Sequence, residues 1–420
     1  MAGNIEQVET VIIGGGHAGL TMSYYLSQLG REHVILERGR VGERWRSERW
    51  DSFHFQFPNW TIELPGYKYH SEEPDAFAPG QDVVRFLDHY AGFIKAPVRC
   101  GVTVMSLEQA AREGRYLIHT QNGTIEAANV VVATGPFQRP AIPPVSAQVP
   151  SDLFQIHSSN YCNSEQLPPG AVLVVGAGSS GGQIAEELIE SGRKVYLSVG
   201  RHRRVPRRYR GRDYVWWSSA MGILDQTLDT LPSPEAKNWP LALLTGVNGG
   251  YDLDLRRMAA GGATLLGHLQ SVAGNTLVIA ADLKETLAKG DVWFTEFKIL
   301  VDDYVTKTGM DVPKESQLVE DVSEPKEVSN PIPELDLKIA GITSIVWATG
   351  FRNDFGWLKL PIFNDTGDPV HRRGVTSFPG IYFLGLRWLY KRKSYFLVMA
   401  GPAEDAAYLA EHITTRGKQD

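Results

Sequence analysis

Two stretches of the chain share one pattern of apolar and polar positions. In the first, apolar runs at 9–13 and 34–37 flank a glycine cluster and a stretch with helical spacing. In the second, apolar runs at 171–175 and 195–197 flank another glycine cluster and another helical stretch. Short β-branched runs that alternate with helical periodicity are typical of βαβ units. Two such units in one chain predict two dinucleotide-binding folds.

A second pair of similar strands indicates how these folds are connected. Residues 129–132 and 344–347 are both β-branched runs that end in Ala-Thr-Gly, and a proline-rich connector at 140–150 follows the first of them. The pattern predicts an α/β protein of two Rossmann-like domains, in which the second dinucleotide-binding domain is inserted into the first. The expected segments, in chain order, are 1–163 (first domain), 164–339 (second domain) and 340–420 (first domain resumed).

Composition narrows the class of protein further. A chain of 420 residues exceeds what one hydrophobic core usually serves, and a net charge of -6 argues against a general nucleic-acid binder. No apolar run reaches the roughly 18 residues of a membrane span. The two cysteines, Cys100 and Cys162, form no CxxC pair, which suits a reducing cytoplasm and provides no zinc site. We therefore expect a cytoplasmic protein with no metal, membrane or nucleic-acid partner.

The first glycine cluster has the spacing GxGxxG, carried by Gly14, Gly16 and Gly19. The first glycine permits a tight turn, the second lets the backbone approach a diphosphate, and the third lets the helix pack closely on the strand. The diphosphate then meets the positive end of the helix. Glu37 ends the next strand, where a carboxylate accepts hydrogen bonds from a ribose hydroxyl. The first unit is therefore predicted to bind FAD.

The second glycine cluster repeats this fingerprint. Its predicted cofactor contacts are Gly176, Gly178, Ser179, Ser180 and Gly181. At the end of the following strand, Ser198 and Arg201 stand where the first unit has its glutamate. An acidic residue would repel a 2′-phosphate, whereas a hydroxyl and a guanidinium donate hydrogen bonds to it. The second unit is therefore predicted to bind NADPH. Seven arginines occur from 201 to 212, and we expect most of them to pair with nearby carboxylates.

With these motifs, the chain resembles the class B flavin-dependent monooxygenases, and within them the bacterial flavoproteins known as CzcO-like or TrkA-like. Other segments that carry the resemblance are 44–46, 133–135, 157–161, 348–351 and 380–385. It implies further cofactor contacts at Arg44, Trp45, Thr134, Gly135, Thr349, Gly350 and Gly385. In the group's fingerprint, FxGxxxHxxx followed by an aromatic residue or proline, His157 and Tyr161 match, but Ser151 and Leu153 replace the Phe and Gly.

The resemblance also implies a reaction. NADPH would reduce the flavin, O2 would add to give a flavin hydroperoxide, and a small organic substrate would collect one oxygen atom. Oxidation of nitrogen or sulfur is favoured, because no residue matches the active-site arginine of Baeyer–Villiger enzymes. Gln56 and Asn59 are alternatives for a polar side chain near the reacting flavin edge, and His157 is expected to orient the linker and NADPH. Candidate substrate contacts are Trp216, Trp217, Trp388, Lys391, Arg392 and Lys393.

Other functions remain open at this point. An NADPH oxidase or dehydrogenase that oxygenates nothing has the same motifs, and so does a non-catalytic flavin redox sensor linked to cation transport. A disulfide reductase of this architecture needs a CxxC pair by the flavin, which the chain lacks. We expect a small-molecule substrate and O2 as partners, and we keep a homodimer open as the assembly.

Overall fold

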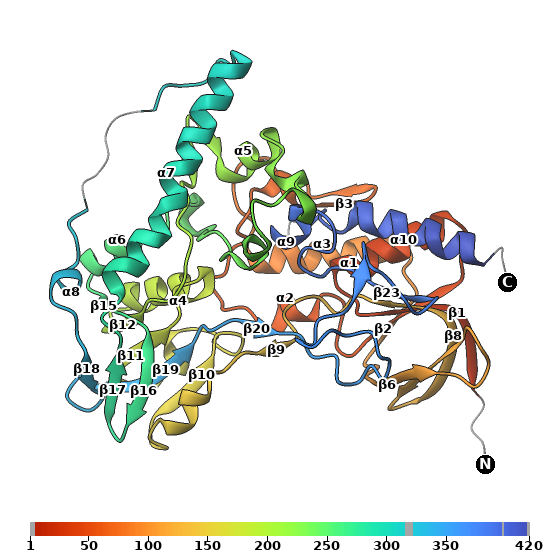
Figure 1. The fold of residues 1–420 in the computed structure, drawn as a ribbon, viewed down its shortest axis with the longest axis horizontal. Coiled ribbons are helices and arrows are strands. Elements are labelled where there is room, and N and C mark those ends of the chain that lie inside the picture. Colours follow the sequence, from red (N-terminus) through yellow and green to blue (C-terminus); the bar gives the residue numbers. More distant parts are fainter. Residues whose placement is uncertain (1–4, 316–321, 397–398, 418–420) are drawn as a thin grey trace.

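The computed structural model describes residues 5–315, 322–396 and 399–417 (Figure 1). Its first sheet has the strand order β21-β22-β23-β8-β1-β2-β5, and β7 joins β6 to β8. The central strands β8, β1 and β2 are parallel. The strands are β1 (Glu6–Ile13), β2 (His33–Glu37), β5 (Val98–Cys100), β6 (Val104–Gln109), β7 (Tyr116–Thr120), β8 (Gly123–Val132), β21 (His371–Arg372), β22 (Val375–Thr376) and β23 (Ile381–Phe383).

Helices cover this sheet. The first helix follows the first glycine cluster and packs against the last helix, which brings the two ends of the chain together on the same part of the molecule (Figure 1). The helices and short strands of this region are α1 (His17–Gln28), α2 (Glu43–Ser47), α3 (Gly80–Phe93), α9 (Arg392–Phe396), α10 (Ala403–Arg416), β3 (Glu63–Leu64) and β4 (Tyr67–Lys68).

The second sheet has the strand order β10-β19-β11-β12-β15, and all of its neighbouring strands are parallel. Its strands are β10 (Phe154–His157), β11 (Ala171–Val175), β12 (Val195–Ser198), β15 (Thr264–Leu266) and β19 (Ile342–Trp347). All five residues of β11 are buried, as expected for a central parallel strand that is covered on both faces.

Different elements cover the two faces of the second sheet. One face packs against apolar residues of α4 and α6, and the other packs against a small antiparallel sheet of β16, β17 and β18. The 26-residue helix α7 extends away from this sheet (Figure 1). The remaining elements here are α4 (Ser179–Glu190), α5 (Tyr214–Ala220), α6 (Leu255–Ala260), α7 (Leu283–Thr308), α8 (Lys326–Ser329), β13 (Arg208–Tyr209), β14 (Arg212–Asp213), β16 (Leu269–Ala273), β17 (Thr276–Ile279) and β18 (Glu334–Asp336).

The α/β class and the two βαβ units are confirmed, but the segment boundaries differ from the expected ones. Both β10, expected in the first FAD segment, and β19, expected in the second, lie in the second sheet. There β19 pairs with β11 just as β8 pairs with β1. The two Ala-Thr-Gly strands are therefore equivalent members of two folds. The first sheet resumes only at β21, so the second sheet still lies within the first in sequence.

The chain crosses between the two sheets along a short ribbon. On the way out it forms β9 (Arg139–Pro140), and on the way back it forms β20 (Phe351–Arg352). These two strands pair antiparallel and lie between the sheets (Figure 1). In the part of the chain that the structure describes, no helix has the length and apolar character needed to cross a membrane.

Candidate functional site

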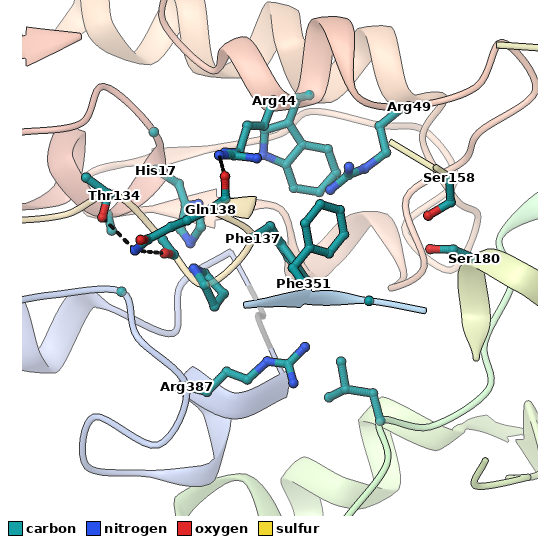
Figure 2. Close-up of a pocket in the computed structure, with 18 of the residues that line it drawn as sticks. His17, Arg44, Arg49, Thr134, Phe137, Gln138, Ser158, Ser180, Phe351 and Arg387 are labelled. Carbon is teal, nitrogen blue, oxygen red and sulfur yellow. Dashed lines mark hydrogen bonds between the residues drawn. The ribbon is translucent and has the colours of Figure 1, made fainter. Parts of the chain in front are cut away.

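A cavity of about 800 Å³ lies between the two sheets and reaches both glycine clusters (Figure 2). Its walls include the end of β1, the glycine turn after β11, the starts of α1 and α4, and the two segments that cross between the sheets. The predicted site residues that line it are Gly14, Gly16, Glu37, Arg44, Trp45, Gln56, Thr134, Gly135, Gly176, Gly178, Ser179, Ser180, Arg201, Thr349, Gly350 and Gly385. The structure therefore brings residues from the whole length of the chain to one space.

The first glycine turn has the geometry of a diphosphate site. Gly14 has φ +114°, and a Cβ there would lie 2.6 Å from the carbonyl oxygen of Ala133. A Cβ on Gly19 would lie 2.0 Å from the carbonyl oxygen of Gly14, so this glycine lets α1 pack against β1. By contrast, a Cβ on Gly16 would meet nothing within 4 Å, because Gly16 faces the cavity. No side chain caps the start of α1, which leaves its N–H groups for an anion.

Glu37 is held in place by the same turn. Its carboxylate accepts hydrogen bonds from the backbone N–H groups of Gly15 (2.7 Å) and Gly39 (2.8 Å). Each carboxylate oxygen keeps a second lone pair for a ribose hydroxyl. Nearby, Arg44 donates to Glu48 (2.5 Å) and to the carbonyl oxygen of Gln138 (2.9 Å), although burial lowers its pKa. These residues fit the adenosine half of a dinucleotide.

The second glycine turn repeats this geometry at the start of α4. Gly176 has φ +104°, and a Cβ there would lie 2.5 Å from the carbonyl oxygen of Ala348. A Cβ on Gly181 would lie 1.8 Å from the carbonyl oxygen of Gly176, whereas a Cβ on Gly178 would meet nothing within 4 Å. No side chain caps α4. The cavity therefore has two places for a diphosphate, one at the start of each helix.

Of the two residues predicted to select NADPH, one lines the cavity and the other does not. Arg201 is exposed and lines the cavity beyond the end of β12. Ser198 is 3% exposed and does not line the cavity. Its hydroxyl donates to the carbonyl oxygen of Gly267 (2.9 Å) and accepts from the N–H of Leu269 (3.2 Å). Since these bonds tie β12 to the segment after β15, the predicted phosphate contact of Ser198 is not made from this position.

Gln56 and Asn59 are the two alternatives for a polar side chain near the reacting edge of the flavin, and only one of them lines the cavity. Gln56 lines the cavity. Asn59 is buried outside its lining, where its amide nitrogen donates to the Ser71 hydroxyl (3.1 Å) and to the carbonyl oxygen of Glu73 (2.9 Å). The Asn59 amide thus stabilises the loop that contains Ser71 and Glu73. Of the two residues, Gln56 stays the candidate for the polar contact near the flavin.

His157 lies at the end of β10, beside the cavity rather than in its lining. Its Nδ1 accepts a hydrogen bond from the N–H of Ser159 (3.1 Å), so its Nε2 carries the proton and donates to the carbonyl oxygen of Gly350 (3.0 Å). Burial lowers the pKa of His157, which favours the neutral ring. The ring therefore joins the end of β10 to Gly350 at the start of the returning crossing, which agrees with an orienting role and not with acid–base chemistry.

Comparisons with known proteins agree with this architecture. Residues 11–215 match the family model described as pyridine nucleotide-disulphide oxidoreductase. The CzcO-like oxidoreductase of Geobacillus kaustophilus (strain HTA426) is 32% identical over 409 residues, which cover 97% of this chain and 98% of that protein. The chain belongs to the CzcO-like oxidoreductases. The predicted resemblance to class B flavin monooxygenases, and the prediction of an enzyme, are thereby confirmed. The predicted cofactors, FAD and NADP(H), are confirmed at the level of the family.

Two more distant proteins share the architecture of this CzcO-like chain. The indole-3-pyruvate monooxygenase YUCCA1 of Oryza sativa subsp. japonica is 26% identical over 377 residues, which cover 88% of this chain and 82% of that protein. The solved flavin-containing monooxygenase from Stenotrophomonas maltophilia superposes with a TM-score of 0.67 at 17% identity, covering 98% of this chain and 99% of that one. The second likeness shows a shared fold.

Sequence reasoning missed the part that Arg207 plays in this CzcO-like oxidoreductase. Its side chain is 1% exposed and pairs with buried Asp213 (2.7 Å), while Nη1 donates to the carbonyl oxygen of Gln56 (2.8 Å). Arg207, which belongs to the second fold, thus holds the backbone of Gln56, a cavity residue that belongs to the first fold. The only sequence signal was the arginine cluster, from which Arg204 and Arg210 pair with carboxylates as expected.

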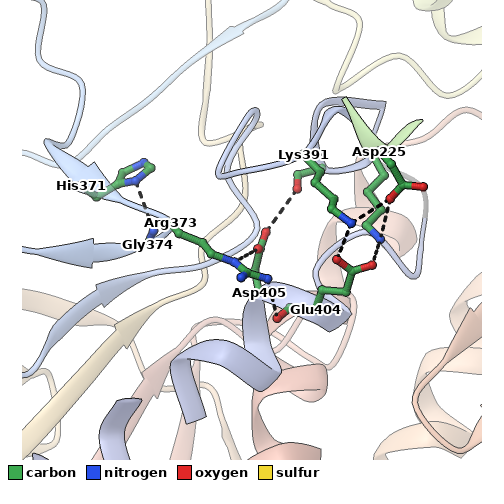
Figure 3. A network of polar contacts seen from close by, with 9 residues as sticks. Asp225, His371, Arg373, Gly374, Lys391, Glu404 and Asp405 are labelled. Atoms are coloured by element: carbon green, nitrogen blue, oxygen red, sulfur yellow. Dashed lines mark hydrogen bonds and ion pairs between the residues drawn. The ribbon is translucent and has the colours of Figure 1, made fainter. Parts of the chain in front are cut away.

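The predicted substrate contacts near the C-terminus of the CzcO-like chain lie elsewhere. Lys391 pairs with Asp225 (3.0 Å) and Glu404 (2.8 Å), and Lys393 pairs with the same two carboxylates (Figure 3). Because these cations are compensated within the protein, the structure does not support a substrate anion there. All six predicted substrate contacts lie outside the cavity lining, namely Trp216, Trp217, Trp388, Lys391, Arg392 and Lys393. The aromatic residues that line the cavity are Trp45, Trp50, Phe53, Phe55, Phe57, Phe137, Trp239, Phe351 and Trp357.

Proposed function

We propose that this chain is an FAD-dependent monooxygenase that consumes NADPH and inserts one oxygen atom from O2 into a small organic substrate, with oxidation of nitrogen or sulfur favoured. The observation that carries the proposal is that one cavity reaches both glycine turns. Two dinucleotides that lie on these turns would extend into the same space, where their reactive rings can meet. Bound FAD would supply the redox chemistry with O2, and NADPH would supply the hydride.

Each wall of the cavity has a distinct role in this proposal. On the first wall, Gly16 and the start of α1 would hold the FAD diphosphate, and Glu37 the ribose. On the second wall, Gly178 and the start of α4 would hold the NADPH diphosphate, and Arg201 the 2′-phosphate. Arg201 is what favours NADPH over NADH, because a guanidinium binds a phosphate through charge-assisted hydrogen bonds.

The middle of the cavity provides a dry environment for the reaction. Aromatic rings such as Trp45, Phe55 and Phe137 line it and displace water from the reacting atoms. The Gln56 amide can donate and accept hydrogen bonds there, and Arg207 holds its backbone carbonyl. No constellation of catalytic acids or bases is needed, because position and exclusion of water are what the protein contributes to flavin chemistry.

The test is the amount of product formed per NADPH consumed. Purified protein should be yellow and should release FAD on denaturation. Amines, sulfides, ketones and indole-3-pyruvate, the last because of the rice relative, are offered in turn while NADPH, O2 and hydrogen peroxide are measured. At least one amine or sulfide should give close to one product per NADPH. NADPH consumption that yields only peroxide with every compound would support the oxidase instead.

A further inference from the structure

Arg49 is a cation in the cavity wall that the sequence motifs do not single out. Its guanidinium carbon lies 5.0 Å from the ring centre of Trp45, 5.5 Å from that of Phe53 and 5.9 Å from that of Phe137. All four residues line the cavity. In Figure 2, Arg49 lies on the side of the cavity that carries Ser158 and Ser180. An arginine among aromatic rings is well oriented, since its flat faces are covered and its N–H edge stays free for an anion.

Arg49 forms no ion pair with any residue that the structure describes, although the nearby Glu48 carboxylate acts to raise its pKa. Its one hydrogen bond is from Nη1 to the carbonyl oxygen of Glu48 (2.7 Å), and the carboxylate of Glu48 pairs with Arg44 instead. Burial lowers the pKa of Arg49 to about 10, so the group is still protonated at neutral pH. Arg49 is half-buried in the cavity wall, and its nearest carboxylate is engaged by another arginine. Its guanidinium can therefore bind an anion that arrives with a ligand.

The segment that follows Arg49 contacts the second fold, which would bind NADPH. Trp50 and Phe53 are buried in the same apolar cluster as Ala177 of the second glycine turn. The Ser52 hydroxyl donates to Glu187 of α4, and the N–H of Asp51 donates to the carbonyl oxygen of Cys162 (2.9 Å). A segment that belongs in sequence to the first fold is thus anchored to the helix of the second. This anchoring holds the segment of Arg49 against the second fold, and Arg49 lies on the same side of the cavity as Ser180 at the start of α4 (Figure 2).

We propose that Arg49 is a further residue of the NADPH site, reaching across from the first fold to bind the diphosphate at the start of α4. The inference rests on the proposed NADPH site and extends it, because the two glycine turns alone would hold each cofactor from one side only. Bidentate hydrogen bonds from a guanidinium suit a diphosphate. In this arrangement NADPH binding itself ties the two folds together.

The test distinguishes binding of the NADPH diphosphate from binding of the 2′-phosphate. The oxidised, FAD-loaded protein is titrated with NADP+, which carries a diphosphate, and with adenosine 2′-monophosphate, which carries only the 2′-phosphate. Arg49→Gln should raise the dissociation constant for NADP+ by roughly 10- to 100-fold and leave that for adenosine 2′-monophosphate unchanged. Arg201→Gln should weaken both. Arg40→Gln is the matched control, since Arg40 is an exposed arginine outside the cavity lining, and should change neither.

The outcomes distinguish this proposal from the function on which it rests. Wild-type protein that binds neither ligand would refute the NADPH site and the proposal together. If the wild type binds both and Arg49→Gln binds NADP+ equally well, the proposal alone is wrong. Loss of FAD in Arg49→Gln would assign Arg49 to the flavin diphosphate, and a raised KM for an anionic substrate with unchanged NADP+ affinity would assign it to a substrate carboxylate. Both outcomes overturn the proposal.

A second variant covers the case in which Arg49→Gln does not fold. Arg49→Lys keeps the charge but loses the planar fork that bridges two phosphate oxygens. It should fold, and should weaken NADP+ binding several-fold while adenosine 2′-monophosphate binds as in the wild type. Unchanged NADP+ affinity in a folded Arg49→Lys protein would overturn the proposal.

Discussion

Gly16 and Gly19 are required for different reasons, although they belong to one motif. A side chain on Gly16 would enter open cavity, so Gly16→Val should fold and yet lose FAD, because the valine occupies the place of the diphosphate. A side chain on Gly19 would collide with the backbone of Gly14, so Gly19→Val should not give stable protein. Circular dichroism and the ratio of flavin to protein absorbance measure the two effects. A folded Gly16→Val protein with a full complement of FAD would contradict the assignment.

Arg201 carries the proposed preference for NADPH. Charge-assisted hydrogen bonds contribute about 1.5–3 kcal/mol each, so Arg201→Ala should reduce the ratio of NADPH to NADH efficiency in flavin reduction roughly 10- to 100-fold. Stopped-flow absorbance of the flavin under anaerobic conditions measures hydride transfer from each cofactor. Arg212→Ala is the control, because Arg212 is exposed and outside the cavity lining. An unchanged ratio in Arg201→Ala would mean that another group holds the 2′-phosphate.

The local geometry that could be predicted from the sequence is that of turns whose spacing is set within one βαβ unit. The spacing of Gly14, Gly16 and Gly19 encodes both the turn and the helix start, so their roles follow from a local pattern. Asn59 and Ser198 differ, because their hydrogen-bond partners come from separate loops that no spacing reveals. A polar residue that stands at the sequence position expected for a cofactor contact can therefore form its hydrogen bonds with a nearby loop instead.

The segment from β12 to α5 depends on the buried pair of Arg207 and Asp213. Arg207→Met would leave the Asp213 carboxylate buried without its cation, which typically costs about 3–5 kcal/mol in the free energy of unfolding. Burial already raises the pKa of Asp213 against the opposing effect of Arg207. Urea unfolding measures the loss, and Arg208→Met, at an exposed neighbour, should cost far less. Adding Asp213→Leu to Arg207→Met should restore part of the stability.

At the scale of elements, the strands and helices of each unit could be predicted from periodicity, but the assignment of two strands to a sheet could not. The runs at β10 and β19 are apolar and short, as are many strands of either sheet. Only their pairing with each other and with β11 shows that both belong to the second fold. Pairing between strands that lie almost 200 positions apart is decided by the whole fold.

The stability of the whole FAD-free molecule should fall in acid. Burial lowers the pKa of His17 to about 4, below the ordinary value of 6.5. As the pH falls from 6.5 towards 4, the unfolded chain takes up a proton that the folded chain does not, so the free energy of unfolding decreases. His17 should contribute to this loss, because its folded-state pKa is the lower one. Burial lowers the pKa of other histidines in the same direction, namely His33, His157, His202 and His371.

Urea unfolding of the apoprotein at pH 7 and pH 5 measures this dependence. His17→Gln removes the titrating ring, so the difference between the two pH values should shrink by the contribution of His17. The same difference in wild type and variant would show that His17 is accessible to protons in the folded protein.

The paired crossings of β9 and β20 tie the two connections between the folds to each other. Both connections run through one antiparallel ribbon, in which Pro140 lies opposite Phe351 and Arg139 opposite Arg352. The ribbon is not alone in joining the folds, because Ser52 also contacts Glu187 and Arg207 contacts the backbone of Gln56. A displacement of one cavity wall relative to the other would therefore have to break these contacts as well as bend the ribbon.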